Sequence, residues 1–233
     1  MILYLIRHGR QSSSDCNVDV PLSEAGQKQA ELLGERMKRY PVDALYSSNL
    51  VRAVETARIA FADRPDLLRE HQLIPDFREI DFGDLTGCPD AQVKEFYRQY
   101  YEENLQAFKD GRERLPAASA GTAKYFVPTG EMAYPHGEDG YMVLERVLPE
   151  LERILATKKQ HVAIVTHGGV IRILLAALFG GDVRKRLLFG TSLENCGITQ
   201  IHYDEEKGGF FLDRFNDYAH IEACEELMRR HFA

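Results

Sequence analysis

The stretch MILYLIRHG, residues 1–9, decides how the rest of the sequence is interpreted. Its first six residues form an apolar run, which is typical of a strand buried on both faces of a parallel sheet. The run ends abruptly in Arg7, His8 and Gly9. In open α/β sheets, ligands bind beyond the carboxyl ends of the strands. The polar ending therefore predicts side chains placed at a ligand-binding rim, with Gly9 allowing backbone to approach the ligand closely.

A second stretch, HVAIVTHGG at residues 161–169, has the same form. Its apolar run ends in His167 and Gly168, so we expect both histidines at one rim of one sheet. The apolar sequence that follows predicts a helix over residues 170–180, and amides at its start can face an anion.

A third short strand is predicted over residues 42–48, and a helix follows over residues 49–62. Arg52 falls in the first turn of that helix, so it belongs to the same rim. Two arginines, two histidines and a helix N-terminus together indicate a pocket for a phosphate dianion.

Strands and helices alternate along the chain, which predicts an α/β fold. We expect one domain over residues 1–233. It should be a three-layer sandwich in which helices flank a mostly parallel central sheet. Helical spacing also predicts a helix over residues 23–40 capped by Ser23, and another over 141–157 that is kinked or broken at Pro149.

Two segments outside this alternation carry further expectations. Residues 204–209, DEEKGG, predict the turn of a β-hairpin, and the tail from about Tyr218 could form a last helix. Residues 88–140 are too long for an ordinary connection and predict an insertion or lid. Its aromatic residues either pack as the core of a helical insertion or form an apolar wall for a leaving group; they are Tyr97, Tyr100, Tyr101 and Phe108.

Composition and charge narrow the class of protein. The chain has 233 residues, 44% of them hydrophobic, and a net charge of -7, which argues against a nucleic-acid partner. No apolar run approaches the roughly 20 residues of a membrane span, and the N-terminus lacks a secretory signal. The four scattered cysteines show no zinc spacing, which favours reduced thiols. A cytoplasmic protein with no membrane partner, no metal and no cofactor is expected.

Five motifs together resemble the histidine phosphatase superfamily, in the branch of the cofactor-dependent phosphoglycerate mutases and of the small-phosphatase type. They occur in the family's order and are LIRHGR, SSNLVRAVETA, FREIDFGDLTG, PHGEDG and VTHGGV. The match covers most of residues 1–87 and 135–220. The motif RHG alone would be a weak signal, but the set is specific.

The resemblance implies a role for each matching residue. His8 is the nucleophile that forms a phosphohistidine, and Glu79 is the proton donor. Arg7, Arg52 and His167 hold the phosphoryl group and complete the catalytic set. The sequence leaves the protonation state of Glu79 open, and its alternative is a surface carboxylate paired with Arg78.

The substrate-binding set is expected to be Arg7, Arg10, Gln11, Ser14, Arg52 and Gly168. Glu138, in PHGEDG, matches a signature near the site entrance. The loop after RHG departs from the family, since Arg10, Gln11 and Ser14 replace its usual residues, and Asn17 could substitute only if the loop folds differently. Arg10 either meets a second anionic group of the substrate or points to solvent or to an acid.

The chemistry suits a histidine beside arginines. Attack on phosphorus needs a neutral imidazole, and the guanidinium groups of Arg7 and Arg52 disfavour protonation of His8 while balancing phosphate charge. A covalent intermediate divides hydrolysis into two easier steps. A positioned acid that protonates the leaving oxygen contributes about 10²–10⁴-fold.

The favoured function is therefore that of a histidine acid phosphatase-like phosphoric monoester hydrolase. It would be metal-independent and would hydrolyse a small phosphorylated metabolite. One alternative is a phosphoglycerate mutase. Mutases of this family carry paired arginines in the insertion, whereas here Glu113 separates Arg112 from Arg114, which argues against mutase activity. The other is a non-catalytic phosphate-binding module. The oligomeric state stays open, with a homodimer among the alternatives.

Overall fold

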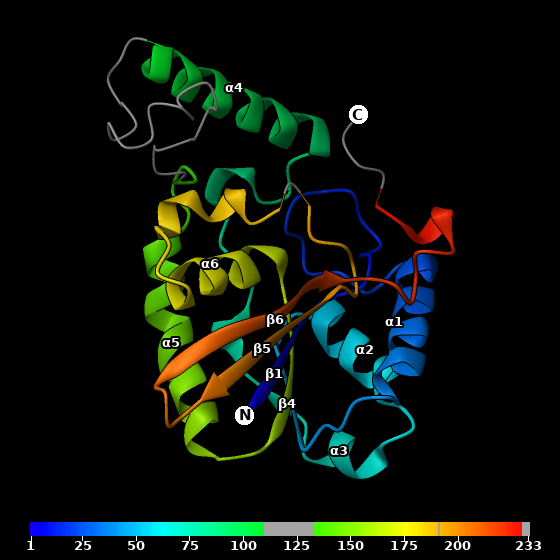
Figure 1. Ribbon diagram of the computed structural model, residues 1–233. Coiled ribbons are helices and arrows are strands. Elements are labelled where there is room, and N and C mark those ends of the chain that lie inside the picture. The colour runs from blue at the N-terminus through cyan, green and yellow to red at the C-terminus, as the bar shows by residue number, and fades with distance from the viewer. Residues whose placement is uncertain (110–132, 191, 230–233) are drawn as a thin grey trace.

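The computed structural model describes residues 1–109, 133–190 and 192–229. Within these ranges one sheet has six strands in the order β3-β2-β4-β1-β5-β6 (Figure 1). The first four in that order run parallel, while β5 pairs antiparallel with β1 and with β6. The expected mostly parallel sheet is confirmed. The strands are β1 (Ile2–Arg7), β2 (Ala44–Ser47), β3 (Gln72–Leu73), β4 (His161–Thr166), β5 (Ile198–Asp204) and β6 (Gly209–Asp217).

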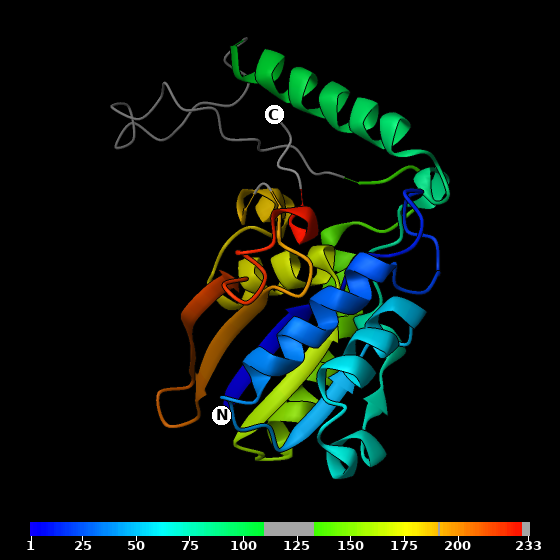
Figure 2. The same ribbon diagram turned by 90° about the vertical axis from the view of Figure 1, so that its right-hand side faces the viewer.

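Helices cover both faces of the sheet, as Figure 2 shows most clearly. Leu3 and Leu5 of β1 pack with α5 and α6, whereas Tyr4 and Ile6 pack with α1 and α2. This alternation follows from the two-residue period of a strand, and it buries β1 on both faces. The expected three-layer arrangement is thereby confirmed. The helices are α1 (Glu24–Met37), α2 (Val51–Ala60), α3 (Pro65–Arg69), α4 (Asp90–Lys109), α5 (Gly140–Ala156) and α6 (Gly168–Leu178).

Local signals fix most boundaries, with one correction. The Ser23 side chain accepts a hydrogen bond from the amide of Gly26 and caps α1, as expected. Helix α5 is not broken at Pro149, because the buried face on either side of the proline holds the helix against the sheet, and a kink there remains a prediction. The predicted last helix is wrong: residues 218–229 form turns and one short 3-10 helix. The 3-10 helices are η1 (Pro75–Phe77), η2 (Gly83–Leu85), η4 (Val183–Leu188) and η5 (Glu225–Leu227).

The described part of the predicted insertion is chiefly α4, which lies beyond the end of the sheet where β1 and β4 finish (Figure 1). The Tyr97 hydroxyl lies 2.6 Å from the Tyr134 hydroxyl, and the Tyr134 ring stacks on Phe82 at 4.4 Å between centroids. Arg112 and Arg114 lie outside the described residues. The lid role and the single-domain organisation remain predictions.

In the described ranges, no helix has both the length and the apolarity needed to span a bilayer.

Candidate active site

Two parallel strands carry the predicted histidines to one place. Arg7 at the end of β1 pairs in register with Thr166 at the end of β4, so His8 and His167 leave the sheet side by side. Their ring centroids lie 4.9 Å apart, and both side chains are buried. The structure thus brings together the two histidines that the sequence placed at one rim.

The geometry around His8 fixes which ring nitrogen is available. Its Nδ1 lies 2.7 Å from the carbonyl oxygen of Gly9. A carbonyl can only accept, so Nδ1 carries the proton and the lone pair is on Nε2. Burial lowers the pKa of His8 well below its usual value, and the charges of Arg52 and Arg7 lower it further. The neutral imidazole that nucleophilic attack requires is therefore the favoured form.

Arg52 connects the nucleophile to the loop that follows it. Its Nε lies 3.3 Å from His8 Nε2, and its Nη groups donate to the Asn17 side chain at 2.9 Å and to the Val18 carbonyl at 3.0 Å. Asn17 adopts a left-handed backbone with φ 49°, and it also donates to the Ile80 carbonyl. The loop therefore folds so that Asn17 reaches the site, which is the condition under which Asn17 could substitute for the family's usual residue.

Arg7 and His167 each keep one buried nitrogen with no partner in the described part of the chain, namely Arg7 Nε and His167 Nδ1. Another nitrogen of each side chain does have a partner. Arg7 Nη1 donates to the Leu193 carbonyl, and His167 Nε2 lies 2.9 Å from the Ser48 hydroxyl. Buried polar atoms without partners are rare and costly, and a bound anion would satisfy both.

Glu79 lies against the start of α6. Its carboxylate accepts hydrogen bonds from the amide of Gly169 at 3.1 Å and from the amide of Ile80 at 3.0 Å. The expected anion at this helix N-terminus is thus a side chain of the protein itself. The alternative in which Glu79 pairs with Arg78 is not found, since Arg78 lies 3.6 Å from Glu138 instead.

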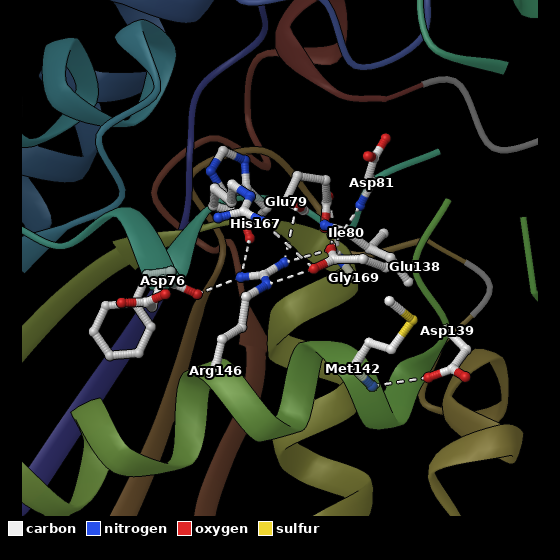
Figure 3. Close-up of polar contacts among 12 residues, drawn as sticks. Asp76, Glu79, Ile80, Asp81, Glu138, Asp139, Met142, Arg146, His167 and Gly169 are labelled. Atoms are coloured by element: carbon white, nitrogen blue, oxygen red, sulfur yellow. Dashed lines mark hydrogen bonds and ion pairs between the residues drawn. The ribbon is translucent and has the colours of Figure 1, made fainter. Parts of the chain in front are cut away.

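A buried ion pair holds the segment that carries Glu79 (Figure 3). Arg146 of α5 donates to Glu138 through Nε and Nη2, both at 2.8 Å, and to the carbonyls of Asp76, Arg78 and Glu79. Burial raises the pKa of Glu138, but Arg146 and the Asp81 amide outweigh it and hold that pKa below its usual value. The signature residue Glu138 therefore fixes the entrance segment rather than facing the histidines.

The remaining predicted binding residues line the cavity, and their contacts within the protein differ. Arg10, Gln11, Ser14 and Gly168 all border the cavity that contains Arg7 and His8. Gln11 Nε2 donates to two carbonyls of its own loop, and the side chain of Arg10 donates to carbonyls of the C-terminal tail. A Cβ on Gly168 would lie 3.5 Å from Arg7 Nε, so that glycine packs against the predicted phosphate-binding guanidinium.

Helix α1 packs closely against the backbone of Gly9. A Cβ there would lie 2.7 Å from the Gly26 carbonyl of α1, so the glycine lets the helix approach the nucleophile loop. The expectation that Gly9 lets backbone approach a ligand closely remains a prediction.

Sequence reasoning left several neighbours of the site unassigned. Asn195 donates to the His8 carbonyl at 2.8 Å, and Thr56 accepts from the Gly9 amide at 2.9 Å. Ser48 and Thr56 fall inside the quoted motif SSNLVRAVETA, which could have pointed to both. Asn195 and the cavity-lining Arg229 have no such signal, because distant segments bring them to the site.

No cluster of histidine, cysteine and acidic side chains suited to a metal occurs among the described residues. The cysteines at positions 16, 88, 196 and 224 are all free thiols there.

A model of the histidine phosphatase superfamily (branch 1) matches residues 3–218. The chain belongs to this superfamily. The chain is similar to an uncharacterized phosphatase, PhoE, of Bacillus subtilis, which is 29% identical over 87% of this chain and 89% of its own length. Phosphoglycerate mutase 1 of Saccharomyces cerevisiae is 30% identical over 78% of this chain and 81% of its own.

Solved structures agree with the family assignment. A mycobacterial glucosyl-3-phosphoglycerate phosphatase, determined with inorganic phosphate, superimposes with a TM-score of 0.72 and 25% identity over 95% of this chain and 99% of its own. The expected recognition and fold class are confirmed, and the comparisons support the phosphoric monoester hydrolase class.

Proposed function

We propose that the protein is a metal-independent phosphomonoesterase that acts on a small phosphorylated metabolite through a phosphohistidine on His8. The observation that carries this proposal is the geometry of His8. Its Nδ1 proton is held by the Gly9 carbonyl, and its Nε2 lone pair faces the guanidinium of Arg52. A neutral nucleophile beside two buried cations is what attack on a phosphate monoester requires.

The residues divide the reaction into two displacements. In the first, the Nε2–P bond forms while the ester P–O bond breaks, and Glu79 supplies the proton that the leaving oxygen takes. In the second, Glu79 takes a proton from water, which attacks phosphorus and frees His8. Arg7 and Arg52 balance the charge on the phosphoryl oxygens throughout, and the neutral imidazole of His167 donates a hydrogen bond to them from Nδ1, the nitrogen without a partner in the described part of the chain. Neutralising this charge is the main task of a protein in phosphoryl transfer.

The proposal has three further elements. The phosphate-binding group consists of Arg7, Arg52 and Gly168, with Arg10, Gln11 and Ser14 at the border of the cavity. The working enzyme needs no cofactor and no metal. It acts in the cytoplasm on a small molecule, with neither nucleic acid nor membrane as partner.

The test is hydrolysis of p-nitrophenyl phosphate in EDTA. Wild type is expected to turn over and to form an acid-labile phosphoprotein, and His8→Ala is expected to do neither. His161→Ala is a matched control, because His161 begins β4 at the opposite end of the sheet. Equal turnover by wild type and His8→Ala would contradict the proposal.

Mutase activity is the second candidate, favoured by the likeness to phosphoglycerate mutase 1. It predicts interconversion of 2- and 3-phosphoglycerate that depends on added 2,3-bisphosphoglycerate. An enolase-coupled assay measures it. Release of inorganic phosphate without interconversion would reject the mutase and retain the phosphatase.

A further inference from the structure

The C-terminal tail brings an additional arginine to the cavity of the active site. Arg229 borders the same cavity as Arg7, His8 and Arg172, although it lies near the opposite end of the chain from His8. Arg172 lies in α6, on the wall of the cavity formed by the helix that begins at Gly168. Among the described residues, eight cationic and five acidic side chains border this cavity, so cations outnumber acids around it.

The tail is fixed although most of it has no regular secondary structure. Arg10 Nη2 donates to the carbonyls of Leu227 at 2.8 Å and Met228 at 2.9 Å. Gln29 Nε2 donates to the Leu227 carbonyl at 2.6 Å. These bonds tie the tail to the nucleophile loop and to α1.

A third anchor acts at Arg229 itself. Its amide donates to a carboxylate oxygen of Glu194 at 2.8 Å. Glu194 stands next to Asn195, whose side chain donates to the His8 carbonyl. The backbone of Arg229 is thus held directly to the frame of the site, and a side chain on a backbone fixed in this way is preorganised for binding.

The carboxylates of Glu194 and Asp90 act on the charge of Arg229 without pairing with its guanidinium. No ion pair joins its guanidinium to a carboxylate within the described ranges. Burial lowers its pKa, and the neighbouring cations Arg172 and Arg10 lower it further, while Glu194 acts in the opposite direction. Arg229 in turn lowers the pKa of Arg7 and that of His8, after larger contributions from burial. Since Arg229 borders the same cavity as Arg7 and His8, its charge acts on the phosphoryl site.

We propose that Arg229, with Arg172 beside it, binds a second anionic group of the substrate. The preferred substrate would then be a phosphate monoester whose alcohol part carries a carboxylate or a second phosphate. The inference rests on the proposed function for the reacting end of the molecule. It assigns the second anionic group to Arg229 rather than to Arg10, which holds the tail in place.

The test uses three esters of one chain length: 3-hydroxypropyl phosphate, 2-carboxyethyl phosphate and propane-1,3-diyl bisphosphate. The first lacks a second anion, and the other two distinguish a carboxylate from a phosphate. The quantity measured is kcat/KM for each anionic ester divided by kcat/KM for the hydroxyl ester. This ratio removes any effect of Arg229 on His8 and Arg7 that all three esters share.

Wild type is expected to prefer an anionic ester, and Arg229→Gln to lower that preference about tenfold to hundredfold, the loss expected for a hydrogen bond to a charged group. Arg229→Lys should keep part of the preference. Arg69→Gln is the matched control, because Arg69 lies on α3 with 76% of its side chain exposed and pairs with Asp66. An unchanged ratio in Arg229→Gln would overturn the inference and leave the phosphatase intact.

Calorimetric binding of the same esters separates the two proposals. Absence of turnover by wild type on every ester would contradict the proposed function. Weaker binding of an anionic ester to Arg229→Gln, with binding of the hydroxyl ester unchanged, would still support the subsite. Equal binding of all three esters to both proteins would overturn it.

Discussion

Glu79 accepts a hydrogen bond of 3.1 Å from the amide of Gly169, two residues after His167. This contact is possible only because position 169 lacks a side chain: a Cβ there would lie 2.4 Å from Glu79 Oε1. The second glycine of THGG therefore makes room for the proposed acid, and the start of α6 determines where Glu79 stands.

Gly169→Ala is expected to displace Glu79 and to lower kcat for p-nitrophenyl phosphate by about 10²–10⁴-fold, the range typical of a lost acid–base group. Formation of the fold should be affected little, because Gly169 lies in helix α6, where alanine is a better helix former than glycine. Gly209→Ala in the β5–β6 hairpin is the control, since its nearest neighbour would be 3.8 Å away. A kcat equal to that of wild type would show that the position of Glu79 does not depend on a glycine at position 169.

Arg146 and Glu138 hold the segment of Glu79, and both side chains are about nine-tenths buried, with 11% and 10% exposed. Arg146→Met leaves the buried carboxylate of Glu138 with only the more exposed Arg78, at 3.6 Å, and loss of the main partner of a buried charge typically costs about 3–5 kcal/mol. A Tm lower by about 6–20 °C is expected for a chain of this size. The measurement is thermal unfolding followed by circular dichroism.

The double variant Glu138→Leu/Arg146→Met distinguishes a loss of pairing from a loss of packing. Replacing both members of a buried pair with apolar groups is often close to neutral. The double variant should therefore unfold at a higher temperature than Arg146→Met alone, while its kcat stays low because the carbonyl of Glu79 has lost its anchor. A double variant less stable than either single variant would contradict this account.

The strand ends were predictable from sequence because the signal is local. An apolar run that ends in RHG or THGG predicts both a buried strand and a polar end. The parallel register of β1 and β4 then places the two polar ends side by side. Ser23 was predictable as a cap for the same reason. These features depend on residues within one turn or one strand.

The tail and the environment of Glu79 were not predictable in this way. Residues 218–229 have helix-forming composition, but Arg10, Gln29 and Glu194 bind their backbone groups and stabilise turns instead. Arg229 reaches the site through those contacts, which join segments far apart in the chain. The pairing of Glu138 with Arg146 likewise depends on how α5 packs on the entrance segment.

The buried histidines predict how stability changes with pH. Burial lowers the pKa of His8 and of His167 well below the usual value. Between that lowered value and the ordinary value near ~6.5, the unfolded chain binds more protons than the folded one. The stabilising contribution is complete above about pH 6.5 and is lost as the pH falls below it.

The corresponding measurement compares Tm at pH 7.5 and pH 5.5 for wild type and His8→Gln. Each such histidine removes about 1.4 kcal/mol per pH unit within its window, or about 3–6 °C for a chain of this size. Wild type should therefore lose about that much more on acidification than His8→Gln. His202→Gln, on β5 and outside the site, should behave as wild type does; an equal loss in His8→Gln would contradict the assignment.

Arg10 is predicted to act through Arg229 by holding the tail. Arg10→Ala removes the donors to the carbonyls of Leu227 and Met228. The preference for 2-carboxyethyl phosphate over 3-hydroxypropyl phosphate should fall, through a higher KM with little change in kcat, because His8 and Glu79 are not touched. Since both residues serve one subsite, Arg10→Ala/Arg229→Gln should be no less selective than Arg229→Gln alone. Additive losses in the double variant would instead show that Arg10 binds the substrate itself, the alternative that its position at the cavity border leaves to experiment.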